Sequence, residues 1–324
     1  MLNKNNLIRY ITIDPNKYCN AKCWFCINKY KESKSNILSI ENFELIINKI
    51  LKEKDKVLDP KFDNIIYNHN FNEILLYPYF EDMLKLYRKY NFKTVIFTNG
   101  TNLTPEKINL IIKYNDVCNN ITLNVPSIDK NTWINYTVLN EYNYDKLINN
   151  LNYLHTIINN NIKVFNIING LNDISLFENG GTMSLMKKIP TFVKLDVNEQ
   201  QIKFKEKYPK IITYIRNSLT DWSNFLEEQE IYSLTLNNIV NVKKDNTKII
   251  GCSCSSRIHN HLEINSKGDV FLCINEILGD KNKYGNIFDQ DLYNIWYSEE
   301  RKKIIEYSTT EGICTRCNAA IWGK

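Results

Sequence analysis

Three cysteines lie within eight residues near the start of the chain, and they constrain it more than any other feature. The segment reads Cys19-Asn20-Ala21-Lys22-Cys23-Trp24-Phe25-Cys26, a C-x3-C-x2-C pattern. The chain has 324 residues and nine cysteines; the other six are Cys118 and a second group near the end. In a reducing compartment, cysteines grouped in this way indicate metal or redox chemistry rather than disulfides.

Composition sets the expected location and excludes two kinds of partner. No window reaches ~18 consecutive apolar residues, and residues 1–9 lack the apolar run of a signal peptide. We therefore expect a cytoplasmic protein with no membrane partner. The 41 basic and 36 acidic residues are mixed along the chain and give a net charge of +5. Nothing in this charge pattern indicates a nucleic-acid partner.

Short apolar runs alternate with longer amphipathic ones through the first two-thirds of the chain. The alternation predicts six strands, over 7–13, 64–68, 94–97, 121–125, 162–168 and 191–195. It predicts helices over 40–51 with Ser39 as N-cap, 79–90, 104–114 with Pro105 at its first position, 144–158 and 174–188. Such repeats indicate the α/β class, as a partial (β/α)6 barrel with a parallel sheet. Ligands then bind at the carboxyl ends of the strands.

The last third of the chain has a different sequence pattern. Residues 198–248 carry no motif and are predicted to form a connector with a helix over 211–226. From residue 249 a small cysteine-bearing module is predicted, with a hairpin of 262–264 and 270–272 and a helix over 292–305. The expected domains are therefore 1–197, 198–248 and 249–324.

The first cysteine group suits an iron–sulfur cluster. Three thiolates in one loop can hold three irons of a cubane and leave the fourth iron open for reaction. Trp24 and Phe25 would supply an apolar shell around it. A zinc site or structural thiols are the alternative, but no fourth cysteine or histidine stands nearby to complete a zinc tetrahedron.

The octapeptide, its position after the first strand and the six-strand pattern resemble the radical S-adenosylmethionine (SAM) superfamily, from about Leu7 to Leu195. The resemblance implies that Cys19, Cys23 and Cys26 hold a [4Fe–4S] cluster whose open iron binds the amino and carboxylate groups of SAM. It also implies reductive cleavage of SAM to a 5′-deoxyadenosyl radical that abstracts hydrogen from a substrate. The implied electron donor is a flavodoxin or ferredoxin.

The same resemblance implies a set of residues that contact SAM. Phe25 matches the family position that packs on the adenine, and Asn124 the polar residue after the fourth strand. Glu73 falls where the family has the Glu of Gly-Gly-Glu-Pro, although the glycines and the adjacent proline are missing. Thr98 and Asn99 match the family's Thr-Asn-Gly after the third strand. Asn166 and His69 are weaker candidates, and no residue is identified as the general base.

The second cysteine group has a pattern of its own. Cys254, Gly268, Cys273, Cys314 and Cys317 give C-x13-G-x4-C followed by C-x2-C. Four thiolates from separate segments can fully ligate a second cubane. The pattern resembles the C-terminal extension called SPASM, in its shortened Twitch form, which implies one auxiliary [4Fe–4S] cluster. Cys252 competes with Cys254 for one ligand position, and zinc on the same cysteines is the alternative.

Four further side chains stand out near these groups. Arg257, His259 and His261 lie beside the expected auxiliary cluster, where they could bind substrate or tune its potential. We expect His261 at the hairpin edge and His259 in solvent. Cys118 is expected to be a buried thiol.

The resemblance implies a net oxidation or a crosslink, because the auxiliary cluster in this group passes electrons. The predicted substrate is a small polar metabolite, such as a sugar or aminocyclitol alcohol, or a ribosomal peptide. The barrel begins by residue 7 without a peptide-recognition domain, which favours the metabolite or a peptide delivered by a separate partner. The alternative, motivated by the altered Gly-Gly-Glu-Pro segment, is a catalytically degenerate radical SAM-fold binding or scaffold protein.

Overall fold

One nine-stranded sheet organises the chain. The structure, a computed structural model, describes residues 7–23, 26, 36–68, 72–159, 166–172, 196–216, 258–273 and 282–310. The strand order is β6-β5-β4-β3-β2-β1-β7-β8-β9. The strands are β1 (Tyr10–Ile13), β2 (Ile65–Tyr67), β3 (Lys93–Thr98), β4 (Cys118–Leu123), β5 (Asn166–Asn172), β6 (Ile212–Arg216), β7 (His261–Ile264), β8 (Asp269–Phe271) and β9 (Lys283–Asn286).

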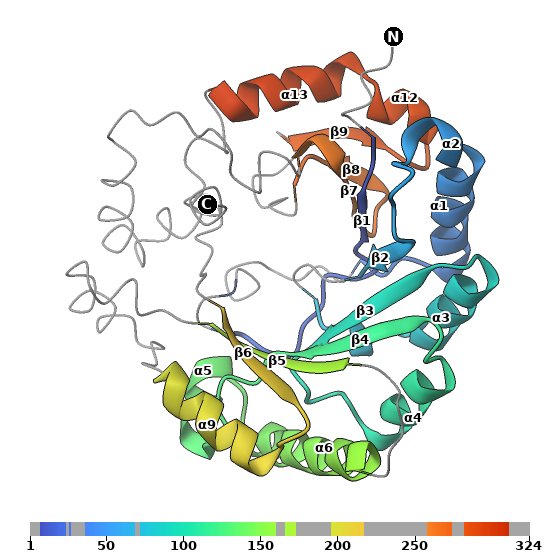
Figure 1. Ribbon diagram of the computed structural model, residues 1–324. Coiled ribbons are helices and arrows are strands. Elements are labelled where there is room, and N and C mark those ends of the chain that lie inside the picture. Colours follow the sequence, from blue (N-terminus) through green and yellow to red (C-terminus); the bar gives the residue numbers. More distant parts are fainter. Residues whose placement is uncertain are drawn as a thin grey trace.

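Helices connect the strands. They are α1 (Ile40–Lys52), α2 (Lys54–Val57), the 3-10 turn η3 (Ile74–Leu76), α3 (Phe80–Lys89), α4 (Pro105–Lys113), α5 (Lys130–Thr137), α6 (Glu141–Asn159), α9 (Val197–Lys207), α12 (Leu292–Trp296) and α13 (Glu299–Thr310). Figure 1 shows α1, α3, α4 and α6 along the outer side of the curved sheet.

The pairing of the strands confirms the predicted fold class. Strands β1 to β6 pair in parallel, each with its neighbour in the chain. β7 extends the sheet in parallel on the other side of β1, and β8 and β9 then add as antiparallel strands. The result is a partial (β/α)6 barrel whose first strand also carries the C-terminal hairpin (Figure 1).

Alternate side chains of each strand separate the two faces of the sheet. Ile11 and Ile13 of β1, Ile66 of β2 and Ile96 of β3 all enter one apolar core with the outer helices. Because successive strand residues point to opposite faces, the residues between them face the inner side. Each fully buried aliphatic side chain stabilises the fold by about 1.5–3 kcal/mol.

Several local predictions are confirmed. Ser39 caps α1, because its Oγ accepts a hydrogen bond from Asn42 N over 3.2 Å. Thr104 caps α4 and Pro105 is the first residue of that helix. The first four predicted strands overlap β1 to β4, and the predicted hairpin is the antiparallel pair of β7 and β8. Cys118 is buried, with 2% of its surface exposed.

Other predictions are wrong. The helix expected over 211–226 is replaced from 212 by β6, the sixth parallel strand, because an apolar run of this length suits a helix and a buried strand equally. β5 overlaps the strand predicted over 162–168 at residues 166–168 and extends to Asn172, and residues 162–165 lie outside the described residues. The single helix over 292–305 is two helices, and Ser298 accepts from Arg301 N over 3.1 Å where α13 starts. The predicted helix over 174–188 and strand over 191–195 lie outside the described residues.

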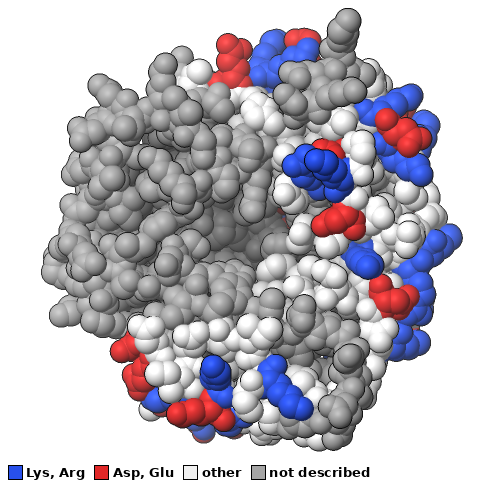
Figure 2. Space-filling model, viewed as in Figure 1, with Lys and Arg blue, Asp and Glu red and all other residues white. Residues whose placement is uncertain are grey.

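Charges are mixed on the described surface. Figure 2 shows Lys and Arg beside Asp and Glu over the outer elements of the face in view. Ion pairs such as Arg9–Asp59 (2.8 Å) and Lys113–Glu81 (3.0 Å) join many of these side chains. No helix among the described residues has the length and apolar character needed to cross a membrane.

Candidate active site

The three cysteines of the C-x3-C-x2-C segment lie in the loop that follows β1, at the carboxyl edge of the sheet. Cys19, Cys23 and Cys26 form no disulfide. Cys26 N donates a hydrogen bond to Cys23 O over 2.9 Å, and Lys22 N donates to Thr137 O of α5 over 3.0 Å. Backbone contacts from the loop itself and from α5 fix the loop, and the charges of Cys19 and Cys26 both act on Cys23.

The donor set fits a [4Fe–4S] cluster. Burial, with a further contribution from the charge of Glu73, raises the pKa of Cys19 to about 12, and burial raises the pKa of Cys23 too. Such thiols lose their protons when a metal supplies positive charge. Among the described residues, no three His, Cys, Asp or Glu side chains lie close enough to share one metal ion. A cubane binds each thiolate through a different iron, so its ligands stand further apart than those of zinc.

Asn99, from the Thr-Asn-Gly segment after β3, braces the cysteine loop. Its Nδ2 donates to Asn20 Oδ1 over 3.0 Å and lies 3.9 Å from Cys19 Sγ. Its Oδ1 accepts from Thr101 N (3.0 Å) and from Thr101 Oγ1 (2.6 Å). The amide is therefore fully used in holding the loop, and its N–H points toward Cys19 Sγ.

Glu73 is buried beside Asn99 and holds its backbone. It is 1% exposed, and its Oε2 accepts from Asn99 N over 2.9 Å while its Oε1 accepts from Leu75 N over 3.4 Å. Its own N–H donates to Tyr18 O, in the cysteine loop, over 2.9 Å. Burial raises the pKa of Glu73 to about 7, and the hydrogen bonds from Asn99 and Thr98 oppose that shift. Glu73 thus ties the segment after β2 to the segments after β1 and β3.

The turn at Gly100 completes the brace. Gly100 has φ +83°, and a Cβ there would lie 2.5 Å from Leu147 Cδ1 of α6. Thr98 Oγ1 accepts from Gly100 N over 3.0 Å. Asn150 Nδ2, also from α6, donates to Gly100 O (2.9 Å) and to Thr101 O (3.1 Å). Glycine is therefore the residue that fits this turn.

Sequence reasoning missed three members of this network: Asn20, Thr101 and Asn150. Asn20 lies inside the cysteine motif, and Thr101 directly follows Thr-Asn-Gly. Their contiguity with the motifs was a usable signal, because a polar residue in such a loop must find a partner when buried. Asn150 carried no signal, since it comes from the middle of an amphipathic helix.

Of the remaining residues predicted to contact SAM, the structure describes two. Asn124 follows β4, and its N–H donates to Thr98 O over 2.9 Å. Its half-buried side chain makes no hydrogen bond in the described part of the chain, so it is available for a ligand. Asn166 begins β5. Phe25 and His69 lie outside the described residues.

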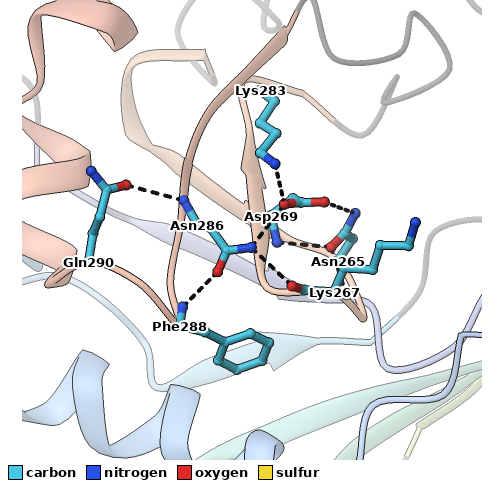
Figure 3. A network of polar contacts seen from close by, with 7 residues as sticks. All are labelled: Asn265, Lys267, Asp269, Lys283, Asn286, Phe288 and Gln290. Carbon is cyan, nitrogen blue, oxygen red and sulfur yellow. Dashed lines mark hydrogen bonds and ion pairs between the residues drawn. The ribbon is translucent and has the colours of Figure 1, made fainter.

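The C-terminal hairpin is held by a polar network of its own (Figure 3). Asp269 forms an ion pair with Lys283 (2.6 Å) and accepts from Asn286 Nδ2 (2.9 Å). Asn286 Nδ2 also donates to Lys267 O (3.1 Å), and Asn286 Oδ1 accepts from Phe288 N (2.8 Å). These contacts join β8 to β9 and fix the turn between β7 and β8.

Gly268 makes that turn, as the pattern predicted. It has φ +78°, and a Cβ there would lie 2.4 Å from the Phe288 ring. Asn265 Oδ1 accepts from Lys267 N (2.9 Å) and Asp269 N (3.0 Å) across it. Cys273, half-buried, comes two residues after β8. Cys252, Cys254, Cys314, Cys317 and Arg257 lie outside the described residues.

His261 lies at the edge of the hairpin, whereas His259 does not lie in solvent as expected. His261 is the first residue of β7 and pairs with Tyr10 of β1, while the pairing of β7 with β8 covers Glu263 and Ile264. It contacts Thr12 Oγ1 at 2.8 Å. His259 is half-buried, and burial lowers its pKa. Arg301 of α13 donates to His259 O over 3.1 Å and stacks on Trp296 at 3.7 Å, which fastens α13 to the start of β7.

Profiles of two known families match parts of the chain. The Radical SAM superfamily profile matches residues 13–178, half of the chain, and the SPASM profile, described as an iron–sulfur cluster-binding domain, matches 252–318. The chain belongs to the radical SAM superfamily and carries a SPASM domain. [4Fe–4S] clusters and SAM are the cofactors of this class.

Solved structures share the fold at low sequence identity. SuiB from Streptococcus suis bound to its precursor peptide SuiA is 16% identical with a TM-score of 0.57, over 97% of this chain and 70% of that one. SuiB bound to S-adenosylmethionine is 15% identical with a TM-score of 0.57, over 97% and 72%. BtrN in complex with AdoMet and 2-DOIA is 14% identical with a TM-score of 0.49, over 96% and 93%. Curated protein sequences give no match.

Proposed function

We propose that this chain is a radical SAM oxidoreductase or maturase that abstracts hydrogen from its substrate and completes a net oxidation or a crosslink with one auxiliary [4Fe–4S] cluster. The braced cysteine loop at the carboxyl edge of the sheet carries the proposal. The substrate is a small polar molecule, such as a sugar or aminocyclitol, or a ribosomal peptide. A flavodoxin or ferredoxin supplies the electron.

Cys19, Cys23 and Cys26 hold the first cluster in this proposal. When bound, the cluster and SAM supply the one-electron cleavage that leads to hydrogen abstraction. Asn99 orients its N–H toward Cys19 Sγ, and a hydrogen bond to a ligand sulfur stabilises the negative charge there. Glu73 fixes the backbone of Asn99. Neither side chain has to move for the loop to bind the cluster.

SAM would lie against the residues that follow the first four strands. Asn124 has a side chain free to contact the cofactor, and Phe25 would pack on the adenine. Glu73, Thr98 and Asn99 are engaged with one another and with the cysteine loop. We therefore assign them to positioning the loop next to the cofactor.

The auxiliary cluster is assigned to Cys273 together with Cys254, Cys314 and Cys317, with Cys252 as the competitor of Cys254. Four protein thiolates leave no open iron, so this cluster transfers electrons and does not bind substrate. The hairpin supports the assignment, because its polar network fixes the start of β8 and Cys273 lies two residues after the end of that strand.

The test is an anaerobic assay for 5′-deoxyadenosine with reconstituted protein, SAM and dithionite. We expect product from the wild type and from Cys118→Ala, whose buried thiol lies in β4, and none from the Cys19/Cys23/Cys26→Ala triple variant. A wild type that carries its clusters but never cleaves SAM would overturn the proposal and favour a binding or scaffold protein. Zinc in place of iron would do the same.

A further inference from the structure

Buried polar side chains lie where β1 meets β7, and the roles assigned above leave them unused. The two strands pair in parallel with Thr12 opposite Glu263. Ile11 and Ile13 of β1 point into the apolar core. Because strand residues alternate between faces, Thr12 and Glu263 face the inner side of the sheet. Asp14, directly after β1, follows the same alternation.

The two carboxyl groups are buried side by side. Asp14 and Glu263 are each 1% exposed. Asp14 N donates to Ile264 O over 2.8 Å, which holds Asp14 against β7. The charge of Asp14 raises the pKa of Glu263 further after burial has done so, which requires the two groups to be close. A buried carboxylate is costly unless a cation or hydrogen-bond donors compensate it.

Three acceptor atoms beside these carboxyls have no hydrogen-bond partner in the part of the chain that the structure describes. They are Asp14 Oδ2, Asn16 Oδ1 and Asn72 Oδ1, each buried from solvent. Asn72 Nδ2 donates to Asp14 Oδ1 over 2.6 Å, and the backbone N–H of Asn16 donates to the carboxyl of Asp14, so both residues contact Asp14. We call Asp14, Asn16, Asn72 and Glu263 the seam site. A bound ligand with several hydrogen-bond donors would pair these acceptors.

The basic groups at the seam site help to decide which kind of cation the site can bind. Among the described residues these are His261, whose Nε2 lies 3.4 Å from Glu263 Oε2, and Lys17, whose charge acts on both carboxyls. The positive charge of Lys17 repels a divalent cation twice as strongly as it repels a singly charged ammonium group. No metal-binding group of three His, Cys, Asp or Glu exists in the described part of the chain. An ammonium group has one charge and three N–H donors, which suits several acceptors and two carboxyls.

We propose that the seam site binds a protonated primary amine of the substrate on the inner face of the sheet. The proposal rests on the proposed function, because it names the chemistry of the molecule that the cysteine loop acts on. The amine can belong to a small polyol ring or to a lysine side chain of a peptide. Asp14 lies five residues before Cys19 in the chain, so an amine held here keeps the substrate beside the cysteine loop.

The experiment measures binding to the reconstituted holoenzyme, saturated with SAM, by ligand-observed NMR titration at pH 7.5. Glucosamine is compared with glucose, and Nα-acetyl-lysine amide with Nα-acetyl-norleucine amide. We expect one amine to bind roughly tenfold tighter than its neutral match, and the responding pair shows whether the source is a small molecule or a peptide. Asp14→Asn and Glu263→Gln should each weaken that amine about tenfold and leave the neutral compound unchanged.

The control variant is Glu53→Gln. Glu53 is a buried carboxyl whose Oε2 already accepts from Tyr293 N, away from the seam site. We expect amine binding to this variant to equal that of the wild type.

Three results would overturn the proposal: amines and neutral compounds bind alike, both seam variants bind the amine as the wild type does, or SAM displaces the amine when it is added to a second sample of cluster-loaded protein prepared without SAM. The last would assign the site to the amino group of SAM. The same samples are assayed for 5′-deoxyadenosine. Cleavage without amine preference defeats only this inference, whereas amine binding without cleavage defeats the proposed function.

Discussion

The cysteine loop after β1 and the hairpin of β7 to β9 are both assigned to iron–sulfur clusters, but they are built differently. The loop carries its three cysteines within eight residues, and buried side chains from other loops brace it, among them Asn99 and Glu73. The hairpin contributes Cys273 alone among the described residues and is fixed by Asp269 and Asn286 within itself.

The difference shows what each region depends on. The loop depends on the rest of the parallel sheet, because its braces come from the segments after β2 and β3 and from α6. The side-chain hydrogen bonds that fix the hairpin turn join residues within 265–290, and Lys49 of α1 adds contacts to Phe288 O and Gln290 O. Damage to the sheet edge should therefore affect the first cluster alone, and damage to the hairpin should affect the second.

The largest effect is expected at Glu73. Glu73→Ala leaves the N–H groups of Asn99 and Leu75 without their buried acceptor, so we expect a loss of roughly 4 kcal/mol in the free energy of unfolding. Urea unfolding measures it, and iron analysis should show loss of the first cluster with the auxiliary one retained. Glu73→Gln keeps one acceptor and should lose less. Equal loss of both clusters would break the comparison.

The next effect concerns pH and the seam where the two regions meet. Burial raises the folded-state pKa of Asp14 to about 7, so the folded state binds more protons than the unfolded state above pH ~4. Stability is then lost as pH rises through this window, by about 1.4 kcal/mol per pH unit up to pH ~7. Between pH 5 and 7 Asp14 should cost the wild type roughly 3 kcal/mol.

Urea unfolding at several pH values checks this, with Asp14→Asn as the comparison. The variant lacks the titrating group, so its stability should fall less steeply than that of the wild type over the same range. Glu263→Gln should act in the same direction, because burial also raises the pKa of Glu263. Parallel curves for the wild type and Asp14→Asn would contradict a buried, proton-binding Asp14.

Substitution of one glycine in each region tests whether the two regions are independent. Gly100→Ala and Gly268→Ala each place a Cβ at positive φ, 2.5 Å from Leu147 and 2.4 Å from Phe288 respectively. Each should lose roughly 2 kcal/mol of stability. Absorption and EPR spectra should show that Gly100→Ala perturbs the first cluster and Gly268→Ala the auxiliary cluster. Interchanged or identical spectral effects would show that the regions are not independent.

The smallest effect is expected at Asn286. Asn286→Ala removes the hydrogen bonds to Asp269, Lys267 and Phe288 and should cost between about 1 and 2 kcal/mol. The control is Arg9→Ala at the exposed Arg9–Asp59 pair, where the loss should be smaller because solvent screens the ion pair. Hydrogen exchange of β8 and β9 amides should quicken in the Asn286 variant alone. Unchanged exchange there would mean that the network does not hold the hairpin.

Contiguous patterns in the sequence predicted both the fold class and the first cysteine group. Cys19, Cys23 and Cys26 stand in one segment, and Thr98 to Gly100 in another, so their chemistry could be recognised without a structure. The seam site could not be predicted, because Asp14 and Glu263 are far apart in sequence and meet only through the pairing of β1 with β7.

The misplaced elements have similar physical causes. The run at 211–215 is apolar at positions that suit a helix and a strand alike, and only pairing with β5 makes it β6. The break between α12 and α13 depends on Ser298 capping the second helix, a short-range contact that helical periodicity conceals.

The most direct test of the two-region account counts iron and follows the reduced clusters by EPR before and after SAM is added. For the wild type we predict about eight irons and a change in one of two signals. The Cys19/Cys23/Cys26→Ala variant should keep about four irons and show no response to SAM. A variant that still responds to SAM, or that loses all of its iron, would contradict the assignment of the open cluster to the loop after β1.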